Sequence, residues 1–132
     1  MINIVNETKF SIPKKVVKNC VAETLKTKHS KAESLSIVFV EPKKIRRLNS
    51  QHMGRDSVTD VLSFTSEEDN YLGDIIICPQ YIKENFAEFI LEICHVVVHG
   101  SLHLLGVHHD DELARQKLHK LEYNIISKVT PS

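Results

Sequence analysis

The sequence predicts an α+β fold in which helices pack on a four-stranded mixed sheet. Two observations support this prediction. Four short segments rich in β-branched residues are typical of strands, and the segments between and after them carry apolar residues at helical spacing. The 132 residues suit one hydrophobic core, so we expect a single domain spanning residues 1–132.

The first half of the chain is predicted to form two strands and two helices. Apolar and polar residues alternate from Ile2 to Asn6, which indicates a strand. A helix is expected from Pro13 to Lys26, because proline fits a first helical turn. Leu35 to Val40 is a β-branched strand. A second helix of about two turns starts at Pro42, runs through residue 48 and ends near Gly54.

Two more strands and a long helical region follow. The strands are predicted at Val58–Phe64 and Leu72–Cys78. Helical sequence then runs from Pro79 to Leu105, with a break near Asn85. Gly106 comes just after the last apolar residue, where a left-handed residue commonly ends a helix.

A last helix is expected to begin in the acidic residues 110–112, since acids favour a helix N-terminus. Its predicted apolar stripe consists of Leu113, Leu118, Leu121, Ile125 and Ile126.

The composition is typical of a globular protein, with 42% hydrophobic and 26% charged residues. No apolar run reaches the roughly 20 residues that span a membrane, and the first residues do not resemble a secretory signal. We therefore expect a cytoplasmic protein without membrane contact. The three cysteines are odd in number and lack CxxC spacing, so we interpret them as buried free thiols.

Charge is distributed unevenly along the chain, although its formal total is zero. Residues 1–64 carry 12 Lys/Arg and 6 Asp/Glu, a balance of +6, whereas residues 65–132 carry 5 and 11, a balance of −6. The basic half suits phosphate groups, and the acidic half, which contains a histidine cluster, suits a cation. Solvated surface is an equally good explanation of both.

The segment from position 99 to 109 predicts a zinc site. His99 and His103 lie one helical turn apart, so both imidazoles reach the same side of the helix. Gly106 lets the chain reverse and bring His109 back toward the ion, with the adjacent His108 as a competing third ligand. Three histidines leave the fourth tetrahedral position for water, as in catalytic zinc sites. We predict one zinc ion bound by His99, His103 and His109.

The same spacing occurs in the metzincin proteases, with one decisive difference. Those enzymes place a glutamate general base directly after the first histidine, where this chain has Gly100. An atypical zinc protease is therefore a disfavoured alternative. His95 lies one turn before His99, too far along the helix from His103 to share its ion. We expect His95 to support the site or belong to the core.

The histidine segment resembles the signature of the YbeY family, bacterial metal-dependent endoribonucleases that mature ribosomal RNA. The matching segments are residues 99–109, Thr59–Phe64 and Leu72–Ile77, together with Glu92 and His95. The resemblance implies zinc ligands at the three predicted histidines and cleavage of single-stranded RNA. It further implies maturation of the small-subunit RNA 3′ end, ribosome quality control, and small-subunit ribosomal proteins and a ribosome-associated GTPase as partners.

This chain departs from the family pattern at two places. His108 stands where the family usually has an acidic residue, and Met53 where it carries a functional arginine. Arg55 is the candidate replacement, since positions two apart in an extended segment face the same side. If Arg55 does not take over, a non-catalytic ribosome-assembly factor with a structural zinc is the alternative. Asp60 and Asp74 either help organise the site or simply form turns.

Overall fold

The computed structural model describes residues 1–31 and 34–129, and within them the chain forms four strands and five helices. In chain order these are β1 (Ile2–Asn6), α1 (Lys14–Thr27), β2 (Ser34–Phe39), α2 (Pro42–Met53), β3 (Val61–Thr65), β4 (Tyr71–Ile77), α3 (Pro79–Asn85), α4 (Phe89–Leu104) and α5 (Glu112–Val129).

The strands form one mixed sheet in the order β1-β2-β4-β3. The β1–β2 and β2–β4 pairs are parallel, and β3 pairs with β4 in antiparallel fashion. Parallel neighbours need a long crossover, which α1 supplies between β1 and β2. The prediction of an α+β fold with a four-stranded mixed sheet is confirmed.

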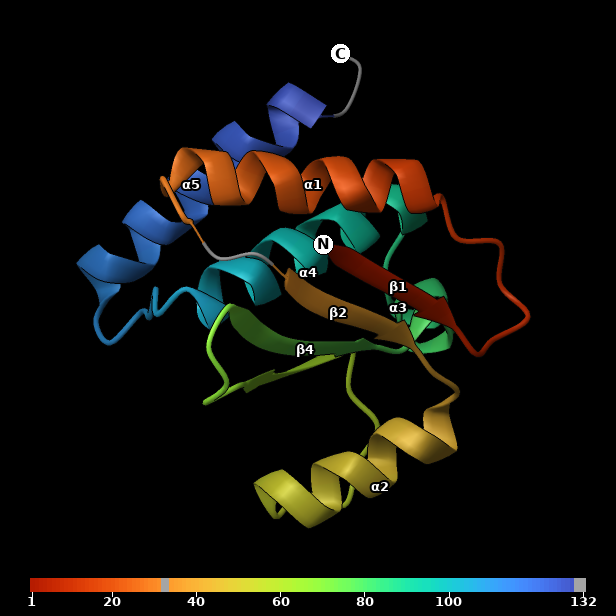
Figure 1. The fold of residues 1–132 in the computed structure, drawn as a ribbon. Helices are drawn as coiled ribbons and strands as arrows, with labels where there is room; N and C mark the ends of the chain where they lie inside the picture. The colour runs from red at the N-terminus through yellow and green to blue at the C-terminus, as the bar shows by residue number, and fades with distance from the viewer. Residues whose placement is uncertain (32–33, 130–132) are drawn as a thin grey trace.

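Helices cover both faces of the sheet. The helices α1, α4 and α5 lie on one side and α2 lies on the other (Figure 1). Successive residues of β4 face opposite layers: Ile75 and Ile77 join the core beneath α1 and α4, while Ile76 packs with Ile45 of α2. Each fully buried isoleucine contributes about 1.5–3 kcal/mol of hydrophobic stabilisation. The larger core therefore holds α4 against the sheet.

One helix end is confirmed and one strand start differs from the prediction. The helix α2 continues beyond residue 48 to Met53 and is followed by Gly54, whose φ of 70° is left-handed, so the predicted end near Gly54 is confirmed. The strand β3 begins at Val61 rather than Val58. The segment before β3 is tied to α2 instead, because the Asn49 side chain donates a hydrogen bond to the carbonyl oxygen of Ser57 (3.0 Å).

The helix α4 is the central helix of the fold and is buried along most of its length. The predicted break after Asn85 separates it from α3, and Gly106, with a φ of 86°, follows its end. It packs tightly on the sheet at Gly100, where an added Cβ would lie 3.0 Å from Ile75 Cγ2 and 3.2 Å from Ser63 Oγ. Glycine therefore lets α4 pack directly on β3 and β4.

The last helix, α5, begins as predicted near its acidic segment. The carboxylate of Asp111 accepts a hydrogen bond from the amide of Ala114 (2.8 Å), which satisfies a free amide of the first turn. Leu118 and Ile125 of the predicted stripe are buried. Leu113 is 62% exposed, so its place in the stripe was wrong. The side chain of Glu122 is buried on this face instead.

None of the helices within residues 1–31 and 34–129 is long and apolar enough to cross a membrane. Cys20, Cys78 and Cys94 are buried free thiols, as predicted.

Candidate site of histidines and a buried carboxylate

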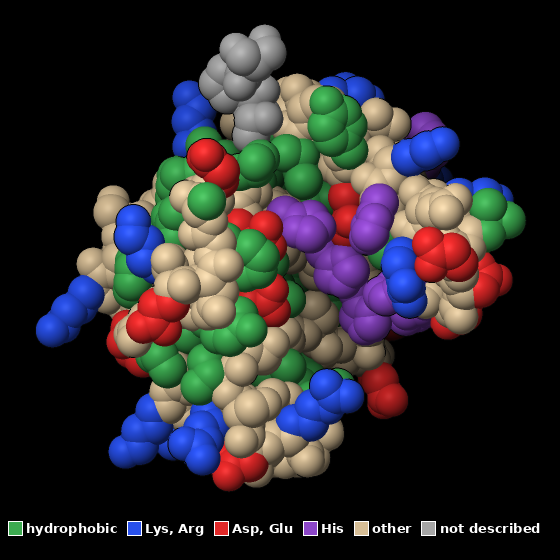
Figure 2. Space-filling model, turned by 180° about the vertical axis from the view of Figure 1, so that it is seen from behind, with side chains coloured by type: hydrophobic (Ala, Val, Ile, Leu, Met, Phe, Trp, Pro, Cys, Tyr) green, Lys and Arg blue, Asp and Glu red, His purple; other side chains and the backbone are tan. Residues whose placement is uncertain are grey.

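Histidine side chains gather on one face of the molecule, with carboxylates beside them (Figure 2). His95, His99 and His103 come from successive turns of α4, and the turn after this helix supplies His108 and His109. The ring centroids of His99 and His109 are 6.0 Å apart, and those of His103 and His108 are 4.9 Å apart. The chain reversal at Gly106 thus brings both candidate third ligands back to α4.

The geometry does not choose between the two candidates. His109 lies beside His99, whereas His108 makes an edge contact with His103. Within the described residues, no three His, Cys, Asp or Glu side chains converge in an arrangement able to hold a metal ion. The donor set suits zinc chemically, because imidazole nitrogens are among its usual ligands. The ligand set of His99, His103 and His109 stays a prediction.

A buried carboxylate fixes the orientation of His99. Only 3% of the Glu122 side chain is exposed, and its Oε2 lies 2.5 Å from His99 Nδ1. A carboxylate only accepts hydrogen bonds, so Nδ1 carries the proton and donates. In the neutral tautomer that donates from Nδ1, the other ring nitrogen, Nε2, is the one that carries the lone pair. A carboxylate that holds one imidazole nitrogen while the other is left for a metal is the usual support of a histidine ligand.

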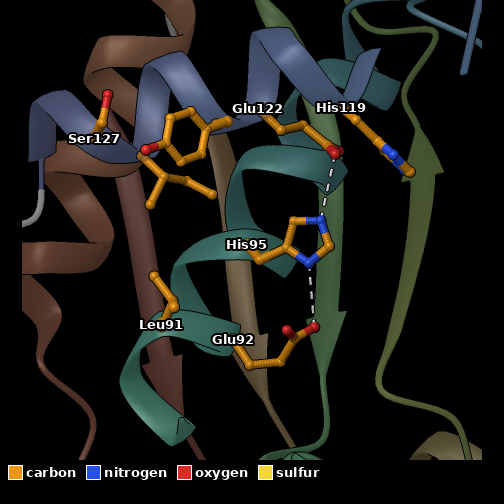
Figure 3. A pocket seen from close by; sticks show the side chains of 8 residues that line it. Leu91, Glu92, His95, His119, Glu122 and Ser127 are labelled. Carbon is orange, nitrogen blue, oxygen red and sulfur yellow. Dashed lines mark hydrogen bonds and ion pairs between the residues drawn. The ribbon is translucent and has the colours of Figure 1, made fainter. Parts of the chain in front are cut away.

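His95 lies between two carboxylates (Figure 3). Its Nδ1 is 3.2 Å from Glu92 Oε2, and its Nε2 is 3.3 Å from Glu122 Oε1. The hydrogen bond to Glu122 raises the pKa of His95 most; burial opposes this and Glu92 adds to it, which brings the pKa to about 9. At neutral pH His95 is therefore a cation that donates to both carboxylates and has no lone pair for a metal.

The surroundings of Glu122 and His103 lower the pKa of both groups, which favours a charged carboxylate and a neutral imidazole. Burial alone raises the pKa of the Glu122 carboxyl, but hydrogen bonds from His95 and His99 outweigh it and lower the pKa to about 2. For His103, burial lowers the pKa, and the neighbouring His108 adds to the effect. Neutral imidazole is the form that binds metals. The site thus contains an ionised carboxylate at Glu122 and, at His103, an imidazole that favours its neutral form.

No hydrogen bond or ion pair between described residues joins Arg55 to the histidines of α4 and the turn after it. Arg55 is exposed just after α2, and α2 lies on the other side of the sheet from α4 (Figure 1). Its guanidinium takes part in none of the ion pairs formed between described residues; Arg46 instead holds Asp56, with Nε 2.8 Å from Oδ1. Met53 ends α2 and Gly54 is left-handed. The extended segment assumed for positions 53–55 was therefore wrong, and strand alternation does not relate Met53 to Arg55.

The two aspartates weighed from sequence interact elsewhere. Asp74 accepts a hydrogen bond from the Tyr71 hydroxyl. The carboxylate of Asp60 accepts one from Thr59 Oγ1 (3.3 Å), and its carbonyl oxygen accepts one from the amide of Cys78 (2.9 Å). These bonds support the structural interpretation of both residues.

The packing at Gly100 bears on the protease alternative. This position faces β3 and β4, and even a Cβ would be crowded there. A glutamate, as metzincins carry after their first histidine, has no room at position 100 unless the sheet moves. The missing general base is thus a consequence of how α4 packs.

Glu122 is the site residue that the sequence analysis missed. It stands four residues after Leu118 and three before Ile125, so it lies within the apolar stripe of α5. An acid on the buried face of a helix needs a partner, since unpaired buried charge is strongly unfavourable. The position of Glu122 in the apolar stripe could therefore have indicated a buried ion pair. The histidine-rich helix α4 could have been identified as the source of its partner.

Comparisons with known proteins show the family of this chain. The family model described as "Endoribonuclease YbeY" matches residues 3–130. A relative of that name from Bdellovibrio bacteriovorus is 35% identical over 119 residues, covering 81% of this chain and 79% of its own length. One from Thermodesulfovibrio yellowstonii is 40% identical and covers 74% and 67%. One from Ruthia magnifica is 32% identical and covers 96% and 92%.

The fold is also similar to a solved structure. The solution structure of TM1509 from Thermotoga maritima aligns with a TM-score of 0.70 and 29% sequence identity. The alignment covers 98% of this chain and 89% of that one, so the likeness extends over the sheet and its helices.

Proposed function

Because the chain belongs to the YbeY family, whose curated relatives are named endoribonucleases, we propose that it is a zinc-dependent endoribonuclease that cleaves single-stranded RNA. The ligands in this proposal are His99, His103 and His109, with one zinc ion per chain. The family resemblance of the histidine segment supports the metal, and the named relatives support the reaction.

The observation that carries the proposal is the hydrogen bond between His99 and Glu122. A carboxylate only 3% exposed holds Nδ1 of an imidazole whose side chain is 34% exposed. A buried charge of this kind is expensive to desolvate. If Glu122 orients a metal ligand, the cost of burying its charge is explained. A purely structural role for His99 would not require a buried charge beside it.

In this proposal each side chain has a separate task. Zinc, when bound, supplies Lewis-acid chemistry toward water and phosphoryl oxygens. Glu122 fixes the ring of His99, and the lowered pKa of His103 keeps that ligand neutral. Arg55 is the proposed phosphate-binding residue, since a planar guanidinium matches phosphate oxygens. Its exposed position means that it meets a long substrate rather than the histidines themselves.

The proposed biological role follows from the family resemblance. We place the protein in the cytoplasm, in maturation of the small-subunit ribosomal RNA 3′ end and in ribosome quality control. Ribosomal RNA is the proposed substrate, and small-subunit ribosomal proteins and a ribosome-associated GTPase are the proposed partners.

One observation favours a second candidate function. Met53, where the family carries arginine, is 57% exposed at the end of α2. Without a cation in that place, the chain would serve as a non-catalytic ribosome-assembly factor in which zinc only holds the last helix, α5, in place.

The test combines metal analysis with RNA cleavage. We expect the purified protein to hold one zinc ion, and His99→Ala and His103→Ala to lose it. Glu122→Gln should lower zinc affinity about 10- to 100-fold, as loss of a residue that orients a ligand typically does. The matched control is Glu112→Gln, at the exposed start of the same helix.

Cleavage of an unstructured RNA, with and without chelator, then decides between the two functions. Chelator-sensitive cleavage supports the nuclease. Bound zinc without cleavage supports the assembly factor. Undiminished zinc in both histidine variants would reject the ligand assignment.

A further inference from the structure

A pocket lies between α4 and α5, next to the histidine site. Its volume is about 550 Å³, within the range of small-molecule binding sites. Leu91, Tyr123 and Ile126 provide apolar and aromatic walls, and Glu92 and Glu122 provide carboxylates. Figure 3 shows the His95 ring between the two carboxylates, with Leu91 to one side of it.

The pocket and the histidine site share one carboxylate. Glu122 holds His99 through Oε2 and His95 through Oε1. Glu122 therefore contacts the predicted metal ligand His99 and also lines the pocket. If RNA is cleaved at the histidines, a nucleotide next to the cleaved bond is within reach of the pocket.

The Glu92 and Glu122 carboxylates are the acceptors of the pocket, which is also lined by His119, Tyr123 and Ser127. Among the described residues, Glu92 forms its one hydrogen bond through Oε2, to His95, and its side chain is 18% exposed. An ionised carboxylate has about four lone-pair positions, so Glu92 can accept further bonds. The carboxylate of Glu92 therefore attracts N–H donors of a ligand in the pocket.

The rim of the pocket suits a flat ring. The side chain of Tyr123 is 72% exposed and that of Leu91 is 49% exposed, so an aromatic and an aliphatic surface stand open to solvent. Unpaired RNA bases are commonly bound by stacking on such groups while their Watson–Crick edges form hydrogen bonds.

We propose that this pocket binds one unpaired nucleobase of the RNA substrate and prefers guanine. Guanine carries two adjacent donors on its Watson–Crick edge, N1–H and N2–H₂, which match the Glu92 carboxylate. Uracil offers a single N–H between two carbonyl oxygens, which the carboxylates repel. This inference rests on the proposed nuclease function, because it makes the pocket a specificity site of that reaction.

Mononucleotides test the pocket separately from cleavage, because they contain no bond between nucleotides. We would titrate the zinc-loaded protein with guanosine and uridine 5′-monophosphates and follow methyl and ring resonances by NMR. Guanosine monophosphate should shift Leu91, Tyr123 and Ile126 and bind about tenfold more tightly than uridine monophosphate, the size of one bidentate base contact.

Variants then assign the preference to particular residues. Glu92→Gln should abolish the difference between the two nucleotides, because glutamine offers one acceptor in place of two. Tyr123→Ala should weaken both equally by removing the stacking surface. Leu113→Ser and Glu112→Gln, outside the pocket on the same helix, serve as controls and should change neither affinity.

The outcomes separate this proposal from the nuclease itself. Chelator-sensitive RNA cleavage without nucleotide shifts in the pocket overturns the pocket and leaves the nuclease standing. Guanine-selective shifts without cleavage support the pocket and reject the nuclease. Equal binding of both nucleotides, unchanged by Glu92→Gln, overturns the guanine preference. Pocket shifts with an arginine-containing peptide but with neither nucleotide overturn the proposal in favour of a protein partner.

Discussion

At the scale of single residues, the hydrogen bond between His99 and Glu122 fixes how the His99 ring is oriented. Spacing puts His99 and His103 on neighbouring turns of one helix, but spacing does not say which ring nitrogen is available. The buried carboxylate fixes the proton of His99 on Nδ1. His95, with both nitrogens engaged by carboxylates, is set apart from the ligand role by the same residue.

The third ligand is open to a direct test. We expect His109→Ala to lower zinc affinity at least about 100-fold, beyond the 10- to 100-fold typical of supporting residues. His108→Ala should have the smaller effect, because the His109 ring lies beside the oriented ligand His99. Competition with a chromogenic chelator measures both, and His119→Ala is the control. A larger loss from His108→Ala would show that the ligand has shifted by one residue.

Arg55 is the residue whose proposed role depends most on the substrate. Arg55→Ala should lower RNA cleavage at least about tenfold, equivalent to roughly 1.4 kcal/mol of transition-state stabilisation, while zinc content stays unchanged. Met53→Arg should raise the rate if the displaced cation limits it. Steady-state cleavage assays measure both, with Arg47→Ala, an exposed arginine of α2, as the control. Cleavage at the parental rate in Arg55→Ala would make Arg55 an ordinary surface residue.

At the scale of elements, glycines set how closely segments approach. Gly100 lets α4 rest on β3 and β4, and Gly73, with a φ of 141°, lets β4 pass the backbone of β3. An added Cβ at position 73 would lie 2.1 Å from the carbonyl oxygen of Phe64. These contacts fix the position of α4, and therefore of its histidines, relative to the sheet.

A pair of glycine substitutions tests this close approach. Gly54 also has a positive φ, but an added Cβ there meets nothing within 4 Å. Gly54→Ala should lower the free energy of unfolding only by the left-handed strain of about 1–2 kcal/mol. Gly73→Ala should lose at least about 2 kcal/mol more, because a backbone atom cannot yield as a side chain does. Urea denaturation measures both, and equal losses would show that the close approach at Gly73 does not limit stability.

At the scale of the whole molecule, α4 and α5 are joined by a buried polar contact as well as by apolar packing. Glu92 and His95 of α4 and Glu122 of α5 form one connected group. The last helix is therefore held in a register that covers the histidine site and forms a wall of the adjoining pocket. The charge of His95 makes this contact dependent on pH.

The sign of that dependence follows from the raised pKa of His95. Its ordinary value is 6.5 and its value in the fold is about 9, so its stabilising contribution is full below pH 6.5 and is lost as the pH rises to about 9. With 42% of the side chain exposed, solvent screening reduces the effect to about 1 kcal/mol. Urea denaturation from pH 6 to 10 should show this loss in the parent and not in His95→Gln. A parallel pH profile in the two proteins would contradict it.

The sequence by itself determined the features that depend on neighbours along the chain. The four strands, the break near Asn85, the helix end at Gly106 and the one-turn spacing of His99 and His103 follow from periodicity and local backbone preference. The resemblance of the histidine segment also indicated the family that the comparisons show. Helix and strand ends were less well predicted, because side-chain bonds such as that from Asn49 decide them.

Only the tertiary structure decided which distant residues meet. Glu122 is 23 residues from His99, and no local pattern specifies that α5 returns across α4 to bury that carboxylate. The sheet order and the crowding at Gly100 have the same origin. Such contacts depend on how whole elements pack, since the free energy of burying apolar faces, rather than local propensity, brings the elements together.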